Sequence, residues 1–551
     1  MEKIWLKSYP SGLPEEIDAD RFSSVAEIWR DACSRYADRP AYSNMGAMLS
    51  YRDMEAMTAS VAGYLRDELK LEKGDRVAIM MPNLLQYPIA LFGVLRAGLA
   101  VVNVNPLYTA RELQHQLSDS GAKAIFILAN FADTLEQVID KTSVEHVVLT
   151  EIGDCLPAPK RWLVNFVVRY VKKMVPAHRV AGVPMRRVVQ AARIRIEPDI
   201  GPQDVAFLQY TGGTTGVAKG AVLTHRNIVA NVQQTVACLE QTSSMDGSII
   251  VTPLPLYHVL ALTANCLAFV QVGALNVLIT NPRDIPAFVK ELSKWKFSVL
   301  TGVNTLFNAL LNDPAFHTLD FSALRIVVGG GMAVQSSVAQ KWKEVTGTVL
   351  IEGYGLTETS PVVCVNPVDL GAYNGSIGLP VPSTEVSFRD TDGNEVPLGE
   401  PGELWVRGPQ VMQGYWQRSD ATAEVLTDDG WLKTGDVAAI DEQGYVRIVD
   451  RKKDMIVVSG FNVYPNEVED AIAAHDEIME VGCIGVPDEK TGEAVKIFVV
   501  LKAGSTLTAE AIKAHAREQL TAYKVPRQIE FRDELPKSNV GKILRRELRD
   551  T

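Results

Sequence analysis

The 551-residue sequence lacks several features that mark secreted, zinc-binding or nucleic-acid-binding proteins. It has only six cysteines, none in a CxxC pair, so neither a disulfide framework nor a zinc site is expected. Acidic residues outnumber basic ones, and the resulting net charge of −11 argues against a nucleic-acid partner. The first residues lack the apolar core of a signal peptide, and we therefore expect a cytoplasmic protein.

One long stretch lacks charge altogether. Residues 248–282 contain no Asp, Glu, Lys or Arg, and the stretch is long enough to cross a bilayer. It is interrupted by Pro253, Pro255, Asn265, Gln271 and Asn276. These interruptions favour a buried strand, helix and strand over a membrane span.

Apolar strands alternate with helices along most of the remaining chain. Strands are predicted at 74–81, 100–104, 124–128, 205–208, 249–251, 274–279 and 298–300. Helices are predicted at 25–36, 51–70, 110–120, 259–271, 284–295 and 303–312. This alternation predicts an α/β fold with parallel or mixed sheets covered by helices on both faces.

The last third of the chain changes character. Short strands and turns over residues 376–450 indicate a β-rich subdomain, and the residues that follow form an α+β unit. We predict a large N-terminal domain over residues 1–450 and a small C-terminal domain over residues 451–551.

A segment rich in glycine and threonine lies between two apolar stretches. It runs from Tyr210 to Gly220 with the sequence YTGGTTGVAKG. Glycine lets the backbone approach a bulky anion, while backbone N–H groups, threonine hydroxyls and Lys219 can bind phosphate oxygens. The GxxxxGK[ST] pattern of P-loop NTPases cannot be placed on it. On its own, the segment is equally compatible with a surface loop.

Four later segments offer groups that would complement a phosphate-binding loop. GGG at 329–331 would let a flat base lie against the backbone, and EGYGLTET at 352–359 supplies an aromatic ring, a hydroxyl and the carboxylate of Glu358, which suits Mg²⁺. Asp436 can accept hydrogen bonds from ribose hydroxyls, and Lys542 can meet developing negative charge. Each segment alone could be a turn, a cap or a solvated charge, and only their occurrence together is specific.

The sequence resembles the adenylate-forming superfamily of acyl-CoA synthetases, luciferases and peptide-synthetase adenylation domains along essentially its whole length. The matching segments are YTGGTTGVAKGA, PLPLYH, GGGMAV, GYGLTETSP, DGWLKTGDVAAIDEQGYVRIVDRKKDMIVVSGFNVYPNEVE and PKSNVGKILRREL. Within the superfamily, MMPNLLQYPIALFGVLRAG, TNPRDIP and GVNTLFNALLN resemble bacterial long-chain fatty-acid–CoA ligases.

The resemblance implies a two-step reaction and a mobile C-terminal domain. ATP and a long-chain fatty acid would give acyl-AMP and pyrophosphate, and CoA would then displace AMP to give acyl-CoA for fatty-acid degradation. ATP and CoA would be co-substrates, with Mg²⁺ as the cofactor. Charge neutralisation should dominate the first step, because it brings two anions together.

The resemblance also assigns site residues. Those implied in ATP or AMP binding are Thr211, Gly212, Gly213, Thr214, Thr215, Gly216, Lys219, Gly330, Gly331, Tyr354, Gly355, Thr357, Asp436, Arg451 and Lys542. Thr211 and Glu358 would bind Mg²⁺. Those implied in catalysis are Lys542, Thr357, Glu358 and His258. Lys542 would bridge the attacking carboxylate and the α-phosphate.

Further positions concern movement and the remaining substrates. Lys453 matches the family's hinge, about which the C-terminal domain would rotate to bring a CoA-binding loop to the site. That loop would include Ser459, Gly460 and Phe461. Some long-chain members carry a tryptophan gate to the acyl tunnel where this sequence has Leu262, so a gate of that type is not expected here.

Between Lys160 and Arg195 there are ten Lys or Arg residues and no acidic residue. Helical spacing over residues 160–175 segregates basic from apolar side chains. The basic side comprises Arg161, Asn165, Arg169, Lys172 and Lys173, and the apolar side Leu163, Phe166, Val167, Tyr170, Val171 and Met174. Such a helix suits either peripheral contact with anionic lipids of the inner membrane face or docking on the core with a solvated basic side.

Three alternatives stay open. The protein could activate another carboxylic acid, deliver its acyl-adenylate to a carrier protein, or bind nucleotide or lipid without catalysis. We expect no nucleic-acid partner, and a homodimer is compatible with the sequence. Chain-length preference depends on tunnel packing, which the sequence does not give.

Overall fold

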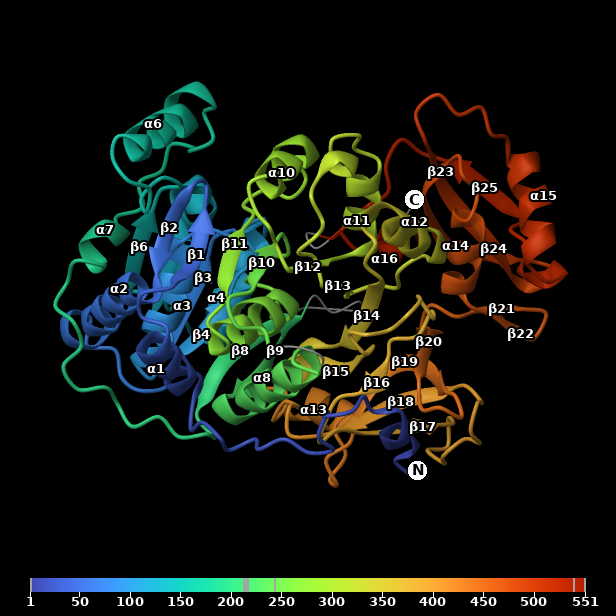
Figure 1. Cartoon of the computed structure of the whole chain (residues 1–551), viewed down its shortest axis with the longest axis horizontal. Helices are drawn as coiled ribbons and strands as arrows, with labels where there is room; N and C mark the ends of the chain where they lie inside the picture. The colour runs from blue at the N-terminus through green and yellow to red at the C-terminus, as the bar shows by residue number, and fades with distance from the viewer. Residues whose placement is uncertain (1, 212–217, 242–243, 539–540, 550–551) are drawn as a thin grey trace.

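The computed structural model describes residues 2–211, 218–241, 244–538 and 541–549 of the chain. Within these ranges the strands form four sheets. Figure 1 shows a large body made from the first four-fifths of the chain and a small C-terminal body, in red, at one end. The predicted α/β architecture, with a large N-terminal and a small C-terminal domain, is confirmed.

The first sheet carries the glycine- and threonine-rich segment at one edge. Its strand order is β7-β6-β5-β3-β4-β8-β9, parallel except for the edge hairpin β8–β9. The strands are β3 (Arg76–Met80), β4 (Ala100–Asn103), β5 (Ala124–Leu128), β6 (His146–Thr150), β7 (Val183–Pro184), β8 (Val205–Thr211) and β9 (Lys219–Thr224). β5 is buried throughout, as expected of a parallel strand covered on both faces.

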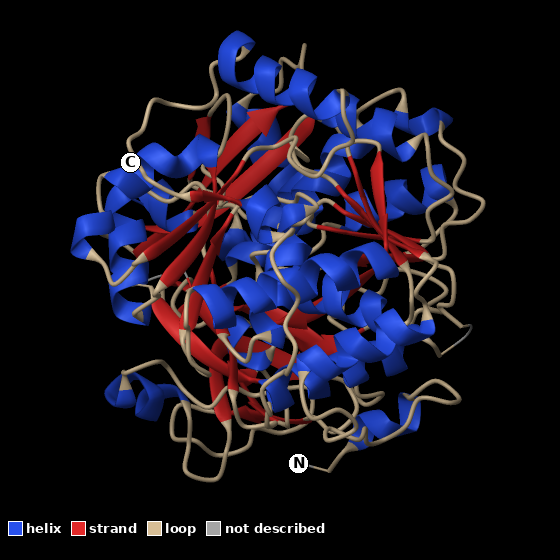
Figure 2. Cartoon of the chain, turned by 90° about the vertical axis from the view of Figure 1, so that its left-hand side faces the viewer, coloured by secondary structure: helices blue, strands red, loops and turns tan. Residues whose placement is uncertain are grey.

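The second sheet brings together strands from distant parts of the chain. Its order is β16-β15-β14-β13-β12-β10-β11-β1-β2. The strands are β1 (Pro40–Asn44), β2 (Ala47–Ser50), β10 (Ile249–Thr252), β11 (Leu275–Leu278), β12 (Val299–Gly302), β13 (Ile326–Gly329), β14 (Leu350–Gly355), β15 (Val362–Val365) and β16 (Leu379–Pro380). Figure 2 shows strand layers in red with helices in blue between and outside them.

The uncharged stretch 248–282 is a buried part of this second sheet. It forms β10, a π-helical segment (Ala261–Leu267), α9 (Ala268–Gln271) and β11, nearly all buried. The predicted strand, helix and strand are therefore confirmed. Among the described residues, no helix is both long and apolar enough to cross a membrane.

Helices with clear end signals form where they were predicted. Thr109 and Glu112 form a capping box at the start of α4 (Ala110–Ser120), and Gly121 ends it with a φ of 60°. The other helices of the large domain are α1 (Val25–Arg35), α2 (Tyr51–Gly63), α3 (Gln86–Arg96), α5 (Ala132–Glu136), α6 (Lys160–Phe166), α7 (Met185–Val188), α8 (His225–Leu239), α10 (Ile285–Leu292), α11 (Asn304–Leu311), α12 (Ser336–Thr346) and α13 (Ser419–Val425).

The β-rich subdomain is an antiparallel sheet. It contains β17 (Glu385–Arg389), β18 (Gly402–Arg407), β19 (Leu432–Ile440) and β20 (Val446–Arg451). Trp5 of the N-terminal arm is buried against it, and a Cβ atom at Gly444 would lie 2.3 Å from the Trp5 backbone. The arm therefore fastens the start of the chain to a sheet more than four hundred residues away.

The small C-terminal body has its own core. Its sheet comprises β21 (Ile456–Val458), β22 (Phe461–Val463), β23 (Ile478–Asp488), β24 (Gly492–Leu501) and β25 (Gln528–Phe531). Helices α14 (Pro465–Ala473) and α15 (Ala509–Gln519) bury Val468, Ile472 and Ile512 in the same cluster. The short α16 (Arg545–Arg549) closes the chain beside β23.

Candidate active site

The β8–β9 hairpin presents the first two predicted phosphate ligands side by side. Thr211 ends β8 and pairs directly with Lys219, the first residue of β9. Gly212, Gly213, Thr214, Thr215 and Gly216 lie outside the described residues. The described ends of the hairpin thus place one hydroxyl and one ammonium group at the same edge of the sheet.

Glu358 lies close to this hairpin, and Tyr415, which the sequence did not single out, contacts both. The hydroxyl of Tyr415 donates to Oε1 of Glu358 at 2.7 Å. The Lys219 ammonium group lies 5.2 Å from the centre of the same tyrosine ring. Tyr415 therefore touches both the predicted metal ligand and the predicted phosphate ligand.

The donor set around Glu358 fits Mg²⁺ bound together with nucleotide phosphates. A single carboxylate and the Thr211 hydroxyl suit a cation that takes its remaining ligands from phosphate oxygens and water. No cluster of three or more His, Cys, Asp or Glu residues suited to a metal occurs in the described part of the chain. Glu358 is only partly buried, so its second carboxylate oxygen can reach an incoming ion.

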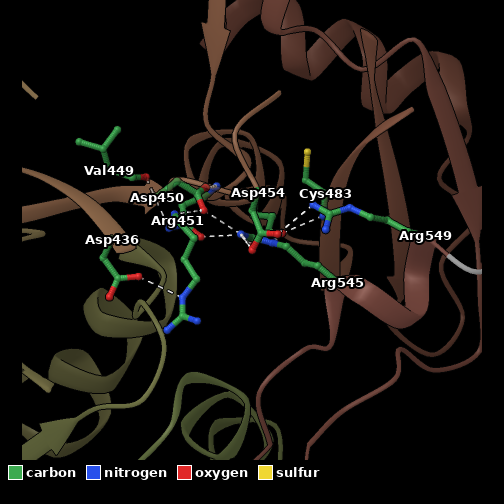
Figure 3. A network of polar contacts seen from close by, with 10 residues as sticks. Asp436, Val449, Asp450, Arg451, Asp454, Cys483, Arg545 and Arg549 are labelled. Carbon is green, nitrogen blue, oxygen red and sulfur yellow. Dashed lines mark hydrogen bonds and ion pairs between the residues drawn. The ribbon is translucent and has the colours of Figure 1, made fainter. Parts of the chain in front are cut away.

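Asp436 is the centre of a compact polar group at the end of β14. Its carboxylate accepts a hydrogen bond from the Tyr354 hydroxyl at 2.5 Å. It also pairs with Nε of Arg451 at 3.0 Å (Figure 3). Asp436 on β19 and Arg451 on β20 are also direct register partners. The arrangement leaves a buried anion beside a cation and an aromatic ring, as ribose and adenine recognition would require.

The predicted adenine loop follows β13. The N–H of Gly330 donates to the carbonyl of Gly302 at 3.1 Å, and Gly331 has a φ of 78°. A Cβ at Gly330 would lie 3.1 Å from Leu260 and 3.4 Å from the carbonyl of Gly353, on the strand that carries Tyr354. Gly330 is thus closely packed, and Gly331 adopts a backbone conformation that favours glycine.

Glu352 is a second residue that sequence reasoning missed. It is 5% exposed and accepts hydrogen bonds from the N–H of Val334 at 2.7 Å and from the Tyr373 hydroxyl at 3.1 Å. Burial raises the pKa of its carboxyl group to about 7. Because Val334 closely follows the glycine loop, Glu352 holds that loop against β14.

Lys542 lies at the same site as Asp436, although the two are more than a hundred residues apart. Desolvation, reinforced by the nearby Arg451 cation and partly offset by Asp436, lowers the pKa of Lys542 to about 8. Burial, together with the charge of the nearby Lys542, lowers the pKa of His258 to about 4. The histidine is therefore neutral at physiological pH, while the lysine is still mostly protonated.

Contacts between the two bodies hold Lys542 there. The hydroxyl of Thr305 on α11 donates to the carbonyl of Gly541 at 3.0 Å. Nearby, Asn308 donates to the carbonyl of Met479 at 2.9 Å, and the N–H of Ser336 donates to Asp470 at 3.0 Å. Sequence motifs did not mark these contacts, because they join residues far apart in the chain.

A charged network surrounds the predicted hinge (Figure 3). Arg545 of α16 pairs with Asp450 at 2.9 Å and with Glu469 at 2.7 Å, and Arg549 pairs with Asp454 at 2.8 Å. Asp450 and Asp454 flank Lys453, which is itself exposed. The network thus links both sides of the hinge segment to the helix that follows Lys542.

The predicted CoA loop is the turn between β21 and β22, on the surface of the small body. Ser459 and Gly460 have φ angles of 52° and 84°, which suits a tight hairpin turn. Phe461 is 57% exposed and stacks on Tyr523 with ring centres 4.9 Å apart. Thr357 and Gly355 instead lie beside Glu358 on the main body. In this arrangement Lys542, and not the CoA loop, lies at the site.

Helix α6 and the π-helical segment after it (Val167–Val171) stand out at the periphery (Figure 1). The predicted basic side is turned partly inward. Arg169 pairs with Glu151, and Asn165 Oδ1 accepts from the N–H of Gly153 at 2.7 Å. The apolar side faces outward, with exposures of 50–64% at Trp162, Leu163, Phe166, Tyr170, Val171 and Met174. Of the two alternatives left open by the sequence, docking on the core with a solvated basic side does not match this arrangement.

Comparison with protein families and curated proteins places these features in context. Residues 29–416 match the AMP-binding enzyme family, and residues 467–542 match the AMP-binding enzyme C-terminal domain. Proteins named long-chain-fatty-acid–CoA ligase from Yersinia pestis and Haemophilus influenzae are 62% and 56% identical, each over 100% of this chain and 98% of their own length.

Solved structures agree with the fold. The anthranilate CoA ligase AuaEII in complex with anthranoyl-AMP superposes with a TM-score of 0.87 at 25% identity, covering 97% of this chain and 98% of that one. ATP-bound MatB from Rhodopseudomonas palustris gives a TM-score of 0.82 at 27% identity, covering 95% and 98%. The chain therefore belongs to the AMP-binding enzyme family, in the group that contains the bacterial long-chain-fatty-acid–CoA ligases.

Proposed function

We propose that the protein activates long-chain fatty acids to acyl-CoA at the expense of ATP. In the first step a fatty-acid carboxylate oxygen attacks the α-phosphorus and the bond to pyrophosphate breaks. In the second, the CoA sulfur attacks the acyl carbonyl carbon and the bond to AMP breaks. The acyl-CoA product would feed fatty-acid degradation.

The residues divide this work by position. Thr211 and Lys219 would hold the β- and γ-phosphates, and Asp436 would hold the ribose beside Tyr354. Glu358 and Thr211 would bind Mg²⁺, which supplies charge neutralisation for the phosphates when bound. Thr357, next to Glu358, would contact the α-phosphate.

Lys542 would make the decisive contribution to the first step. Its ammonium group, partly desolvated between Arg451 and His258, would lie between the two reacting anions. Rotation about Lys453 would then withdraw it and bring Ser459, Gly460 and Phe461 to the acyl-adenylate. The single observation that carries this proposal is the convergence of Lys542 with Asp436 and Arg451.

The test is a product analysis with purified protein, ATP, CoA and fatty acids of graded length. Palmitate and oleate should give acyl-CoA, AMP and pyrophosphate in equal amounts, and butyrate should give far less. Release of ADP and phosphate would contradict the adenylate route. A preference for short or aromatic acids would show that long-chain fatty acids are not the substrate. Transfer of the acyl group only to a carrier protein would show that CoA is not the acceptor.

We further propose that α6 and the adjoining π-helical segment bind the surface of an anionic bilayer. Five large apolar side chains are exposed there, with Met174 just beyond, and Lys160, Lys172 and Lys173 are exposed around them. Apolar side chains can enter the acyl boundary while neighbouring lysines meet anionic headgroups. A second copy of the chain could instead cover this apolar surface. Concentration-dependent dimerisation through α6 would therefore contradict the bilayer proposal.

A further inference from the structure

A groove opens beside α6. Its volume is about 450 Å³, within the ~300–1,000 Å³ of typical small-molecule sites. Its walls come from α6, α7, α2 and the β1–β2 hairpin. The apolar lining consists of Met48, Leu49, Met57, Leu156, Met185 and Val189. None of the residues assigned to nucleotide, metal or CoA lines it.

Two arginines border this apolar groove without a carboxylate partner among the described residues. Nε of Arg161 is buried and has no hydrogen-bond acceptor, and the guanidinium lies 5.5 Å from the ring of Trp162. Arg186, which is exposed, also lines the groove. A guanidinium group can donate several charge-assisted hydrogen bonds, so an anionic ligand in the groove would complement these two arginines.

The carboxylate that does line the groove is already engaged. Asp154 accepts hydrogen bonds from the Thr150 hydroxyl at 3.1 Å, the N–H of Glu151 at 2.8 Å and the Asn165 amide at 3.2 Å. Asp154 is therefore hydrogen-bonded to its own loop and to α6, and not to either arginine of the groove. The groove combines a cationic rim with an apolar interior, which is the complement of an amphiphilic anion.

We propose that this groove is a loading site for a long-chain fatty acid, separate from the catalytic site. The carboxylate would lie between Arg161 and Arg186, and the chain would lie along the methionine-rich lining. Methionine suits this role because its flexible thioether adapts to chains of different shape. The choice of a fatty acid rests on the proposed function.

The position of the groove explains why a second site would be useful. Arg161 lies in α6, next to Trp162 and Leu163. These two side chains are exposed and are proposed to enter a bilayer. A fatty acid that leaves the bilayer at α6 would meet the groove before it reached the nucleotide site.

The test is equilibrium dialysis of the full-length protein against radiolabelled oleate below its micelle concentration, without ATP. The wild type should bind two oleates per chain. Arg161→Gln/Arg186→Gln should lose one of them or weaken it about tenfold, because charge-assisted hydrogen bonds are removed. The matched control, Arg179→Gln/Arg193→Gln, makes the same charge change in the same basic segment outside the groove and should retain both.

A second variant tests the groove by volume instead of charge. Val189→Trp should also lose one oleate, whereas its rate with saturating oleate should stay at the wild-type value. One oleate per wild-type chain, or groove variants that bind oleate like the control, would overturn the loading site. A wild type that makes no oleoyl-CoA would instead contradict the proposed function, whatever the dialysis shows.

Discussion

At the scale of single residues, the main feature of the site is the environment of the Lys542 ammonium group. Lys542 is held beside Arg451, another cation, with Asp436 as the nearby anion. Within the described part of the chain no carboxylate is ion-paired with Lys542, so its charge is available to a negatively charged nucleotide. Desolvation makes the charge more effective at that moment, since there is less water to screen it.

Replacing Lys542 should separate the two half-reactions. Lys542→Ala should slow oleate-dependent pyrophosphate release about a hundredfold or more, because a preorganised charge is lost where negative charge develops. Conversion of supplied oleoyl-AMP and CoA to oleoyl-CoA should stay near the wild-type rate. Lys537→Ala, in the same loop but paired with Glu480, is the matched control. Equal loss of both half-reactions in Lys542→Ala would contradict the role.

The lowered pKa of Lys542 also predicts a pH profile. Only the protonated amine neutralises charge, and its pKa of about 8 means that this form is lost as pH rises through 8. The kcat/KM of adenylation for ATP, which reports the free enzyme, should therefore fall above pH 8. His258, with a pKa of about 4, should add no step between pH 5 and 8. A profile that stays flat to pH 10 would show that Lys542 does not titrate as the structure indicates.

Tyr415 should act as a positioning residue for Glu358. Tyr415→Phe removes the hydroxyl that donates to the carboxylate at 2.7 Å. We expect KM for Mg·ATP to rise about tenfold, since hydrogen bonds to charged groups are worth ~1.5–3 kcal/mol, with kcat much less affected. Tyr9→Phe removes a hydroxyl that donates to the carbonyl of Pro380, outside the site, and serves as control. Unchanged Mg²⁺ dependence in Tyr415→Phe would exclude the role.

At the scale of elements, local signals decided what the sequence could predict. Helix α4 was predicted from residue 110 to residue 120 and forms over those residues, where a capping box and a C-terminal glycine mark its ends. The β1–β2 hairpin was missed because its strands are short and turn at Met45 and Gly46, without an Asn-Gly or Asp-Gly signal. Helical spacing separated the two sides of α6 but could not tell which side packs inward.

The outward apolar side of α6 gives a prediction for this element. Trp162→Ser/Phe166→Ser should reduce co-sedimentation with phosphatidylglycerol-containing liposomes several-fold, because the apolar surface available for burial is lost. Ile196→Ser, at an 86% exposed residue outside the helix, should have no such effect. If liposome binding changed neither with the double substitution nor with salt, the proposal that α6 binds a bilayer would be wrong.

At the scale of the whole molecule, the residues proposed for catalysis come from two bodies that meet at the site. The motif residues could be named from the sequence because each lies in a recognisable segment. Their partners could not, because Tyr415 is 57 residues from Glu358 and Thr305 is 236 residues from Gly541. Such contacts depend on how the bodies pack, and no local pattern records them.

The packing also explains which step this arrangement serves. Thr305, Asn308 and Ser336 hold the small body so that Lys542 lies near Asp436 and Arg451, the proposed nucleotide site, while the loop at Gly460 remains on the surface. This is the arrangement that the proposed acyl-adenylate formation would require. CoA should therefore be unnecessary for the first step.

The most direct test of this account is exchange of radiolabelled pyrophosphate into ATP in the absence of CoA. We expect rapid exchange that requires oleate, because the acyl-adenylate forms reversibly before CoA enters. Exchange that is absent without CoA, or that proceeds equally well without a fatty acid, would contradict an acyl-adenylate intermediate.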